Sequence, residues 1–341
     1  MKEDITVNFK KFFSFLSQNA IYFVLLVLVV IIAFIDPRFI SIRCLRDILL
    51  QSSTRAIIAL GAAFAVLTGG ADLSAGRMVG FAAVISASML QAPDYLRLFF
   101  PGLPQLPLLI PILVAIFACL LFGFINGFVV ARFGVAPFIA TLGTMVIVYG
   151  INSIYFDMPP NQSQPIGGLR ADFTNLGSGA IGTGDYSIPF IVIIAIVVAL
   201  LMWVILNKTR FGKNVYAIGG NINAAKVSGI NVSRTLLAMY ALAGALYGLA
   251  GVLEAARTGG ATNNYGNMYE LDAIAACVVG GVSTTGGIGT VQGIMAGVLI
   301  FSVINYGLTF IGLNPYWQLI IKGLIIVSAV AVDIRKYLTK K

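Results

Sequence analysis

Long apolar runs separated by short polar segments dominate the chain, and their lengths predict helices that cross a membrane. Most runs approach the ~20 residues that an α-helix needs to span the hydrocarbon layer. Open strands would leave backbone groups unpaired in lipid, so helices must carry the fold. The pattern predicts an all-α polytopic membrane protein with about ten transmembrane helices, at residues 21–35, 56–68, 78–90, 108–130, 137–155, 188–206, 236–253, 271–279, 291–308 and 316–332.

Two of these runs are short and are interrupted by a glycine pair. The second run ends at Gly69 and Gly70, and the eighth ends at Gly280 and Gly281. Short glycine-interrupted segments in the two halves of a transporter indicate its pathway, because irregular backbone is tolerated at membrane depth only inside protein or beside water. The alternative is that both pairs only let helices pack closely.

Small polar residues follow each glycine pair. Asp72 and Ser74 follow the first, and Ser283 and Thr284 follow the second. Small polar groups of this kind suit the lining of a path for a polar solute, so we expect these four residues near the pathway. An ionisable residue inside a span indicates function by default. Asp72 also has a structural alternative, since a carboxylate followed by Ser can cap the next helix.

Other charged residues lie near the ends of runs. Residues 39–53 carry charges among apolar side chains, a pattern typical of a separate helix at the outer interface. Glu254 and Arg257 are expected in an outer loop before the eighth run. Lys322 lies one to two turns inside the last run, where we expect it to pair with a neighbouring helix. Facing the pathway and snorkelling to the interface are the alternatives.

The placement of charge predicts the topology. The chain has 341 residues, of which 59% are hydrophobic and 10% charged, and its mean hydropathy of +0.94 excludes a soluble globule with one core. Lys and Arg are in excess in cytoplasmic loops, so the lysines place the tails 1–20 and 335–341 and the loop 207–233 in the cytoplasm. The lysine-free stretch 156–187 is then an outer loop of a single permease domain, 1–341. The net charge of +9 thus sets orientation and does not indicate a nucleic-acid partner.

The composition argues against an enzyme. The chain has no His, and its cysteines at 44, 119 and 277 have no partner at a useful spacing, so no catalytic residue, metal site or cofactor is expected. It also lacks a GxxxxGK[ST] phosphate loop. An ion-coupled secondary transporter of a small polar solute is the alternative function, although its spans would then carry more acids than these do.

The basic loop 207–233 contains small residues at helical spacing. Ala224 and Ala225 are followed by Gly229, which leaves a notch that can accept another protein's surface. This spacing resembles the EAA loop of ABC importer permeases, a short coupling helix that docks on a cytoplasmic ATPase. Asn223 stands where that family usually has Glu. The alternative is a solvated loop.

Several motifs together are specific. GADLSAG, TLGT, TRFGKNVYAIGGN, AAKVSGINV and YELDAIAACVVGGVSTTGGIGT resemble, over essentially the whole chain, permease subunits of bacterial ABC sugar importers of the ribose and galactose class. The last motif, with NPYWQLIIKG, is most similar to the galactose and methyl-galactoside branch. The substrate implied is a monosaccharide of that branch, with glucose as a further candidate, imported at the expense of ATP bound by a partner.

The resemblance also implies an assembly. It implies a homodimer in the bacterial inner membrane, with both termini cytoplasmic and the sugar path along the two-fold axis. A periplasmic or lipid-anchored binding protein delivers the sugar. A cytoplasmic ATPase with two fused nucleotide-binding halves docks on Asn223, Ala224, Ala225 and Gly229.

Overall fold

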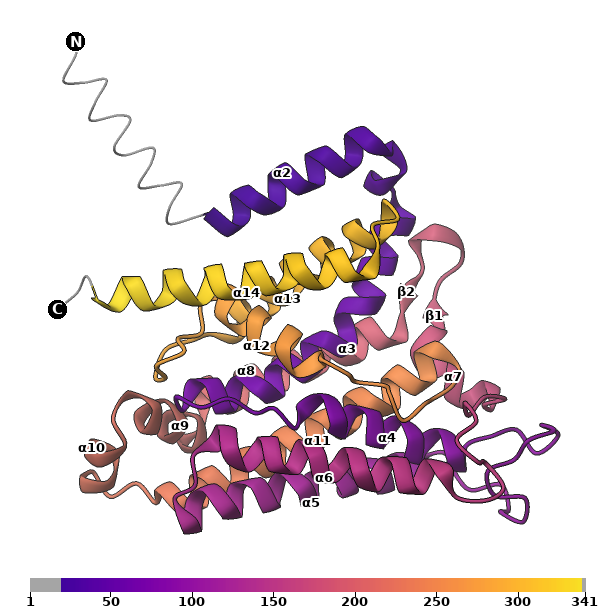
Figure 1. Cartoon of the computed structure of the whole chain (residues 1–341), viewed down its shortest axis with the longest axis horizontal. Coiled ribbons are helices and arrows are strands. Elements are labelled where there is room, and N and C mark those ends of the chain that lie inside the picture. Colours follow the sequence, from indigo (N-terminus) through magenta and orange to yellow (C-terminus); the bar gives the residue numbers. More distant parts are fainter. Residues whose placement is uncertain (1–19, 339–341) are drawn as a thin grey trace.

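The computed structural model describes residues 20–338, most of which are helical, so the expected helical fold is confirmed. Most of the two expected cytoplasmic tails lies outside these residues. In chain order the elements (Figure 1) are α2 (Ala20–Ile35), η1 (Pro37–Ile40), α3 (Ile42–Leu67), α4 (Ala75–Met89), α5 (Leu109–Phe133), α6 (Pro137–Asp157), α7 (Ala171–Ser178), β1 (Ala180–Ile181), η2 (Gly184–Tyr186), β2 (Ile188–Pro189), α8 (Phe190–Lys208), α9 (Arg210–Gly220), α10 (Ile222–Val227), α11 (Val232–Thr258), α12 (Tyr269–Val279), α13 (Val291–Phe310) and α14 (Pro315–Leu338).

Six of the described helices are long and apolar enough to cross a membrane: α3, α5, α6, α8, α11 and α13. α4 and the described apolar parts of α2 and α14 are shorter. α12 has only 11 residues, about 17 Å of helix and thus roughly half of the hydrocarbon thickness. The chain is therefore an integral membrane protein with full-length and short helices in one bundle.

Burial separates the helices at the centre of the bundle from those that face lipid. α3 and α11 are the most buried of the six long helices, whereas α5, α6 and α8 are the least. Large apolar side chains such as Phe117, Ile154 and Leu200 point outward from these three. In water such a surface would be unfavourable, but in lipid it is the expected one.

Glycines set the close packing of α11 against α5. A Cβ on Gly123 of α5 would collide with the carbonyl of Tyr240, and one on Gly244 of α11 would collide with that of Cys119. Helix association in lipid relies on close van der Waals contact, which small residues permit. α11 is thus clamped to α5, and it also packs on α3 and α4.

The separate interfacial helix expected at residues 39–53 is wrong, because most of this segment forms the first half of α3. The hydroxyl of Ser41 caps the helix by accepting a hydrogen bond from the Cys44 amide at 3.2 Å. The polar stretch that follows does not break the helix, since the Ser53 hydroxyl donates to the Leu49 carbonyl of the preceding turn at 2.7 Å. Charged and polar residues are thereby carried into a spanning helix.

A second correction concerns the connection after α11. Glu254 and Arg257, expected in an outer loop, belong to the last turns of α11. The irregular segment begins after them and returns to the start of α4. The approach is close, since a Cβ on Gly266 would collide with the carbonyl of Gly76. The non-helical backbone around Gly266 is therefore packed against α4, while Asn264, Asn267 and Met268 of the same segment stay exposed.

The two polar regions of the chain lie at opposite ends of the bundle. Figure 1 shows α9 and α10 at the left end, where α2 begins and α14 ends. α7 and the antiparallel pair β1–β2 lie at the right end. The loops 207–233 and 156–187 therefore face opposite sides.

Candidate functional site

The polar loop after α8 folds into two short helices in series, α9 and α10. Asn221 begins α10, because its Oδ1 accepts hydrogen bonds from the amides of Asn223 and Ala224, both at 3.0 Å. Asn is among the strongest N-cap residues. This local signal explains why a polar, basic stretch forms a helix at the position expected for docking.

The four residues expected to dock a partner differ in exposure. Asn223, Ala224 and Gly229 are exposed, whereas Ala225 is buried and packs inward. Gly229 has a φ of +80°, the left-handed conformation that commonly ends a helix. Sequence reasoning missed Val227, whose side chain is 91% exposed beside them. An apolar side chain so exposed outside the spans is typical of a surface that contacts another protein.

The first break, between α3 and α4, is held by a buried hydrogen-bond network. Asp72 Oδ1 accepts from the amide and hydroxyl of Ser74 at 3.0 and 2.5 Å, and Asp72 Oδ2 accepts from the Tyr247 hydroxyl at 3.1 Å. Asn126 Nδ2 donates to the Ser74 hydroxyl at 3.0 Å, and Asn126 Oδ1 accepts from Thr144 at 2.5 Å. The break is therefore tied to α5, α6 and α11.

Both expected pathway residues of this break are inaccessible in this conformation. Asp72 and Ser74 are buried, and each makes several of the hydrogen bonds just described. Asp72 accepts from the amide of Ser74, but Ser74 is itself the N-cap residue of α4 and no side chain among the described residues caps this helix, so the capping alternative is wrong. The network ties the break to its neighbours and engages both carboxylate oxygens of Asp72 in this conformation.

The second break lies between α12 and α13, where the chain folds onto itself. The Ser283 side chain is buried, and its hydroxyl shares a hydrogen bond with that of Thr285 at 2.8 Å. The Ser283 amide donates to the Ile288 carbonyl at 2.9 Å. Thr284 is half-buried in the same turn. These contacts form a compact loop whose polar groups serve its own backbone.

The two breaks and α9 meet through glycines. The Gly287 amide donates to the Leu67 carbonyl, the last residue of α3, at 2.8 Å. A Cβ on Gly219 of α9 would collide with this carbonyl, and one on Gly286 would lie 2.8 Å from the Gly219 carbonyl and 2.9 Å from the Gly69 amide. Backbone from three separated segments is thus in direct contact, which we call the glycine junction.

A tyrosine strengthens the glycine junction. The Tyr216 hydroxyl of α9 donates to the Gly289 carbonyl at 3.0 Å. Burial raises the pKa of Tyr216 above its ordinary value, because the phenolate would be poorly solvated there. The phenol therefore keeps its proton, and so this hydrogen bond, at neutral pH.

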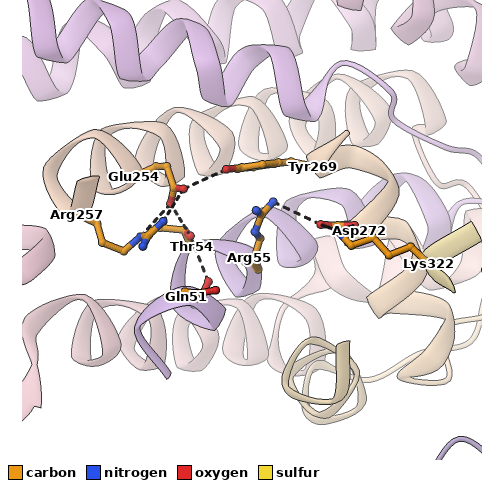
Figure 2. Close-up of polar contacts among 8 residues, drawn as sticks. All are labelled: Gln51, Thr54, Arg55, Glu254, Arg257, Tyr269, Asp272 and Lys322. Carbon is orange, nitrogen blue, oxygen red and sulfur yellow. Dashed lines mark hydrogen bonds and ion pairs between the residues drawn. The ribbon is translucent and has the colours of Figure 1, made fainter. Parts of the chain in front are cut away.

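A cluster of charged side chains crosses the interior of the bundle (Figure 2). Arg55 of α3 lies over the ring of Tyr269, 3.2 Å from its centroid, and its Nη1 is 3.7 Å from Asp272 Oδ2. Lys322 Nζ of α14 donates to both carboxylate oxygens of Asp272 at 3.2 Å. The expectation that Lys322 pairs with a neighbouring helix is confirmed, and Asp272 links α3 to α14.

Glu254 of α11 adjoins this cluster and is joined to it through Tyr269. Its buried carboxylate accepts hydrogen bonds from Thr54 at 2.9 Å, from Arg257 Nη2 at 2.8 Å and from the Tyr269 hydroxyl at 3.1 Å. A buried carboxylate is tolerated when it is paired and hydrogen-bonded in this way. Glu254 thereby fixes the ring on which Arg55 rests.

Sequence reasoning did not find this cluster. A lone Arg at the midpoint of a spanning helix costs about 3 kcal/mol on insertion scales, and Arg55 was a readable signal once residues 42–67 are joined into one helix. The prediction divided this segment into an interfacial helix and a separate span, so Arg55 was not recognised as lying inside a spanning helix. Glu254 and Arg257 were likewise hidden by their assignment to a loop.

Lipid-facing apolar helices, short helices beside irregular segments, and a paired ionic cluster inside the bundle define an integral membrane protein. The chain belongs to the family described as the branched-chain amino acid transport system permease component, which matches residues 44–330. It is a transport component and not a catalytic one.

Curated relatives match nearly the full length. The galactose/methyl galactoside import permease of Haemophilus influenzae is 55% identical over 331 residues, 97% of this chain and 98% of that protein. The Escherichia coli protein of the same name is 53% identical over 335 residues, 98% and 99% of the two chains. The ribose import permease of Bacillus subtilis is 37% identical over 313 residues, 92% and 91%. The resemblance read from the motifs is confirmed, while no solved structure matches.

Proposed function

We propose that this chain is the membrane-spanning subunit of a binding-protein-dependent ABC importer that moves galactose and methyl galactoside inward. The observation that carries the proposal is the 53–55% identity, over nearly the full length, to permeases named for these sugars. The ribose permeases match at only 35–38%. Glucose, a stereoisomer of galactose, is proposed as a second substrate.

Energy is proposed to come from ATP bound by a partner, a cytoplasmic ATPase with two fused nucleotide-binding halves. The chain has no phosphate-binding loop of the GxxxxGK[ST] type. The docking surface proposed is the exposed face of α10, formed by Asn223, Ala224, Val227 and Gly229. Ala225 contributes by packing beneath this face.

The proposed arrangement in the membrane follows from the charges and the bundle. Ten crossings, with α4 and α12 counted as short ones, place both termini and α9–α10 in the cytoplasm of a bacterial inner membrane. A periplasmic or lipid-anchored binding protein would then dock at the end that carries α7. A second copy would complete a homodimer around the sugar path, to which the four residues of the two breaks are proposed to contribute.

The ion-coupled carrier is not favoured. Such a carrier needs acids at membrane depth whose oxygens are free to bind the ion. Asp72, Glu254 and Asp272 are each occupied by hydrogen bonds or ion pairs. A transporter driven by an ATPase docked on α10 does not need acids that are free to bind an ion.

The test is uptake by the permease reconstituted with its ATPase and binding protein in proteoliposomes. Labelled galactose should accumulate only with ATP and with both partners, and uptake should persist after ionophores collapse the ion gradients. Uptake that continues without ATP but stops with the ionophores would establish the ion-coupled alternative instead.

If the ATPase docks on this face of α10, a bulky residue there should separate the ATPase from the permease. Ala224 is exposed, so Ala224→Trp should leave folding intact but keep the ATPase away from α10. We expect at least a tenfold loss of ATPase recovered by co-purification and a comparable loss of uptake, since a clash at a packed interface costs about 1–3 kcal/mol. Ala224→Ser is the matched control and should behave as the wild type. Full ATPase recovery by the Trp variant would contradict docking here.

A further inference from the structure

A small cavity lies beside the ionic cluster, between α3, α12 and α13. Its volume is about 20 Å³, which is room for about one water molecule. Polar groups from all three helices and an aromatic ring meet there, with apolar side chains of α12 and α13 forming the rest of the wall. Its polar lining consists of Arg55, Tyr269, Asp272, Ser302 and Asn305.

Two buried polar atoms in this lining have no hydrogen-bond partner within residues 20–338: Arg55 Nη1 and Asn305 Oδ1. The nearest carboxylate oxygen to Arg55 Nη1, on Asp272, is 3.7 Å away, beyond hydrogen-bond distance. Buried polar atoms normally have partners, so these two call for an explanation. One is a donor and the other an acceptor, the pair that hydroxyl groups can satisfy together.

The neighbouring carboxylate shows the contrast. Glu254 is occupied by Thr54, Arg257 and Tyr269 and serves the structure. The cavity side of the cluster is left incompletely bonded, although α3 and α12 contribute residues to both sides.

The charged groups beside the cavity also cannot face lipid. Arg55 is near the midpoint of α3, and the side chains of Arg55, Asp272 and Lys322 are 29%, 12% and 23% exposed. Intramembrane charges are found facing the protein interior or a water-filled cavity. The opening of this cluster must therefore be covered by water of a path or by another protein surface.

We propose that this cavity is the closed form of a station on the sugar path, where a neutral hexopyranose is held by its hydroxyl groups. The proposal rests on the proposed function and names a contact site for that substrate. Asn305 Oδ1 accepts from one hydroxyl and Arg55 Nη1 donates to another. Tyr269, fixed by Glu254, keeps the guanidinium aimed at the sugar.

Passage requires the station to widen, since the closed volume is far below that of a hexose. The widening proposed is a movement of α12, whose Asp272 lines the cavity and pairs with Lys322 of the neighbouring α14. A station with few hydrogen bonds holds its sugar weakly, as a step of transport requires.

The first test compares deoxy sugars in proteoliposomes that contain the ATPase and binding protein. Asn305→Ala should lower galactose uptake about tenfold, the value of one well-made hydrogen bond. One monodeoxy galactose lacks the hydroxyl that Asn305 contacts. For that analogue, the Asn305→Ala variant and the wild type should have the same uptake rate. The affinity of the binding protein for each sugar is measured separately, so the ratio of rates reports the permease.

Thr309→Val is the matched control, because Thr309 lies one turn further along α13 and its hydroxyl donates to the Asn305 carbonyl of its own helix. This variant should keep the wild-type ratios. An equal loss for every sugar in Asn305→Ala, or no loss, would overturn the station.

The second test asks whether the cavity opens to water. Asn305→Cys, in a background without the three native cysteines, should react with a small polar thiol reagent during turnover and be protected by galactose. An inert thiol overturns the proposal, and cross-linking between two copies at this position would assign the face to a dimer contact. If the wild type imports no galactose, the proposed function fails, whereas thiol reactivity still decides whether this cavity meets water.

Discussion

At the scale of single residues, three acids in the interior are matched by specific donors. Asp72 accepts hydrogen bonds from a tyrosine and a serine. Glu254 accepts from an arginine, a threonine and a tyrosine, and Asp272 accepts from a lysine. Because desolvated charges are costly without partners, these pairings matter more for the bundle than surface ion pairs do.

Glu254→Gln should therefore destabilise the protein. The change leaves the guanidinium of Arg257 without its carboxylate in a mostly buried site, and we expect a loss of about 2 kcal/mol, below the full range for a completely buried pair because Arg257 remains partly exposed. Thermal unfolding in detergent should show a midpoint several degrees lower. Thr54→Val, which removes only one hydrogen bond, should lower it by about half as much. An unchanged midpoint for Glu254→Gln would show that the network contributes nothing measurable.

Single residues were also where the sequence was least informative. Asp72 could be flagged from its position after Gly69 and Gly70, but its partners Tyr247 and Asn126 come from distant helices. No local spacing connects them. Asn221 shows the reverse case, since an Asn in a short polar stretch indicates a helix start without tertiary information.

At the scale of elements, the glycine junction couples α9 to both breaks, and it makes a prediction. Gly219→Ala should place a Cβ against the Leu67 carbonyl and 2.5 Å from the Gly287 amide, which requires backbone to shift. Overpacking of this kind costs about 1–3 kcal/mol. We expect a lower unfolding midpoint and ATP hydrolysis that no longer rises with loaded binding protein.

The adjacent glycine is the control for that prediction. A Cβ on Gly220 meets open space, and both substitutions raise the intrinsic helix propensity of α9 equally. Gly220→Ala should thus keep wild-type stability and coupling. Identical behaviour of the two variants would mean that the junction has no mechanical role.

Periodicity and length predicted most elements, and the failures have one cause. Residues 42–67 and 232–258 form helices longer than their apolar runs, because serine hydroxyls and paired acids let polar residues continue a helix into the bundle. Hydropathy detects what lipid favours, whereas these extensions are stabilised by partners on other helices. The cluster around Arg55 was lost for this reason.

At the scale of the whole molecule, the bundle with its two polar ends predicts which surface faces the cell interior. Single cysteines at Ser178 and Ser228, both exposed, lie in the loops at opposite ends. In intact cells, after removal of the native cysteines, an impermeant thiol reagent should label position 178 and not 228. Labelling of 228 from outside would reverse the orientation derived from the lysines.

The glycine junction also limits how far α9 can move relative to the two breaks. A side chain between two moving parts can change rotamer and absorb a small displacement, but backbone atoms in contact have no such freedom. Between α9 and the two breaks no side chain intervenes at these contacts. A displacement of α9 would then be passed to both breaks by backbone contact alone, so the residues of the two breaks would be displaced together.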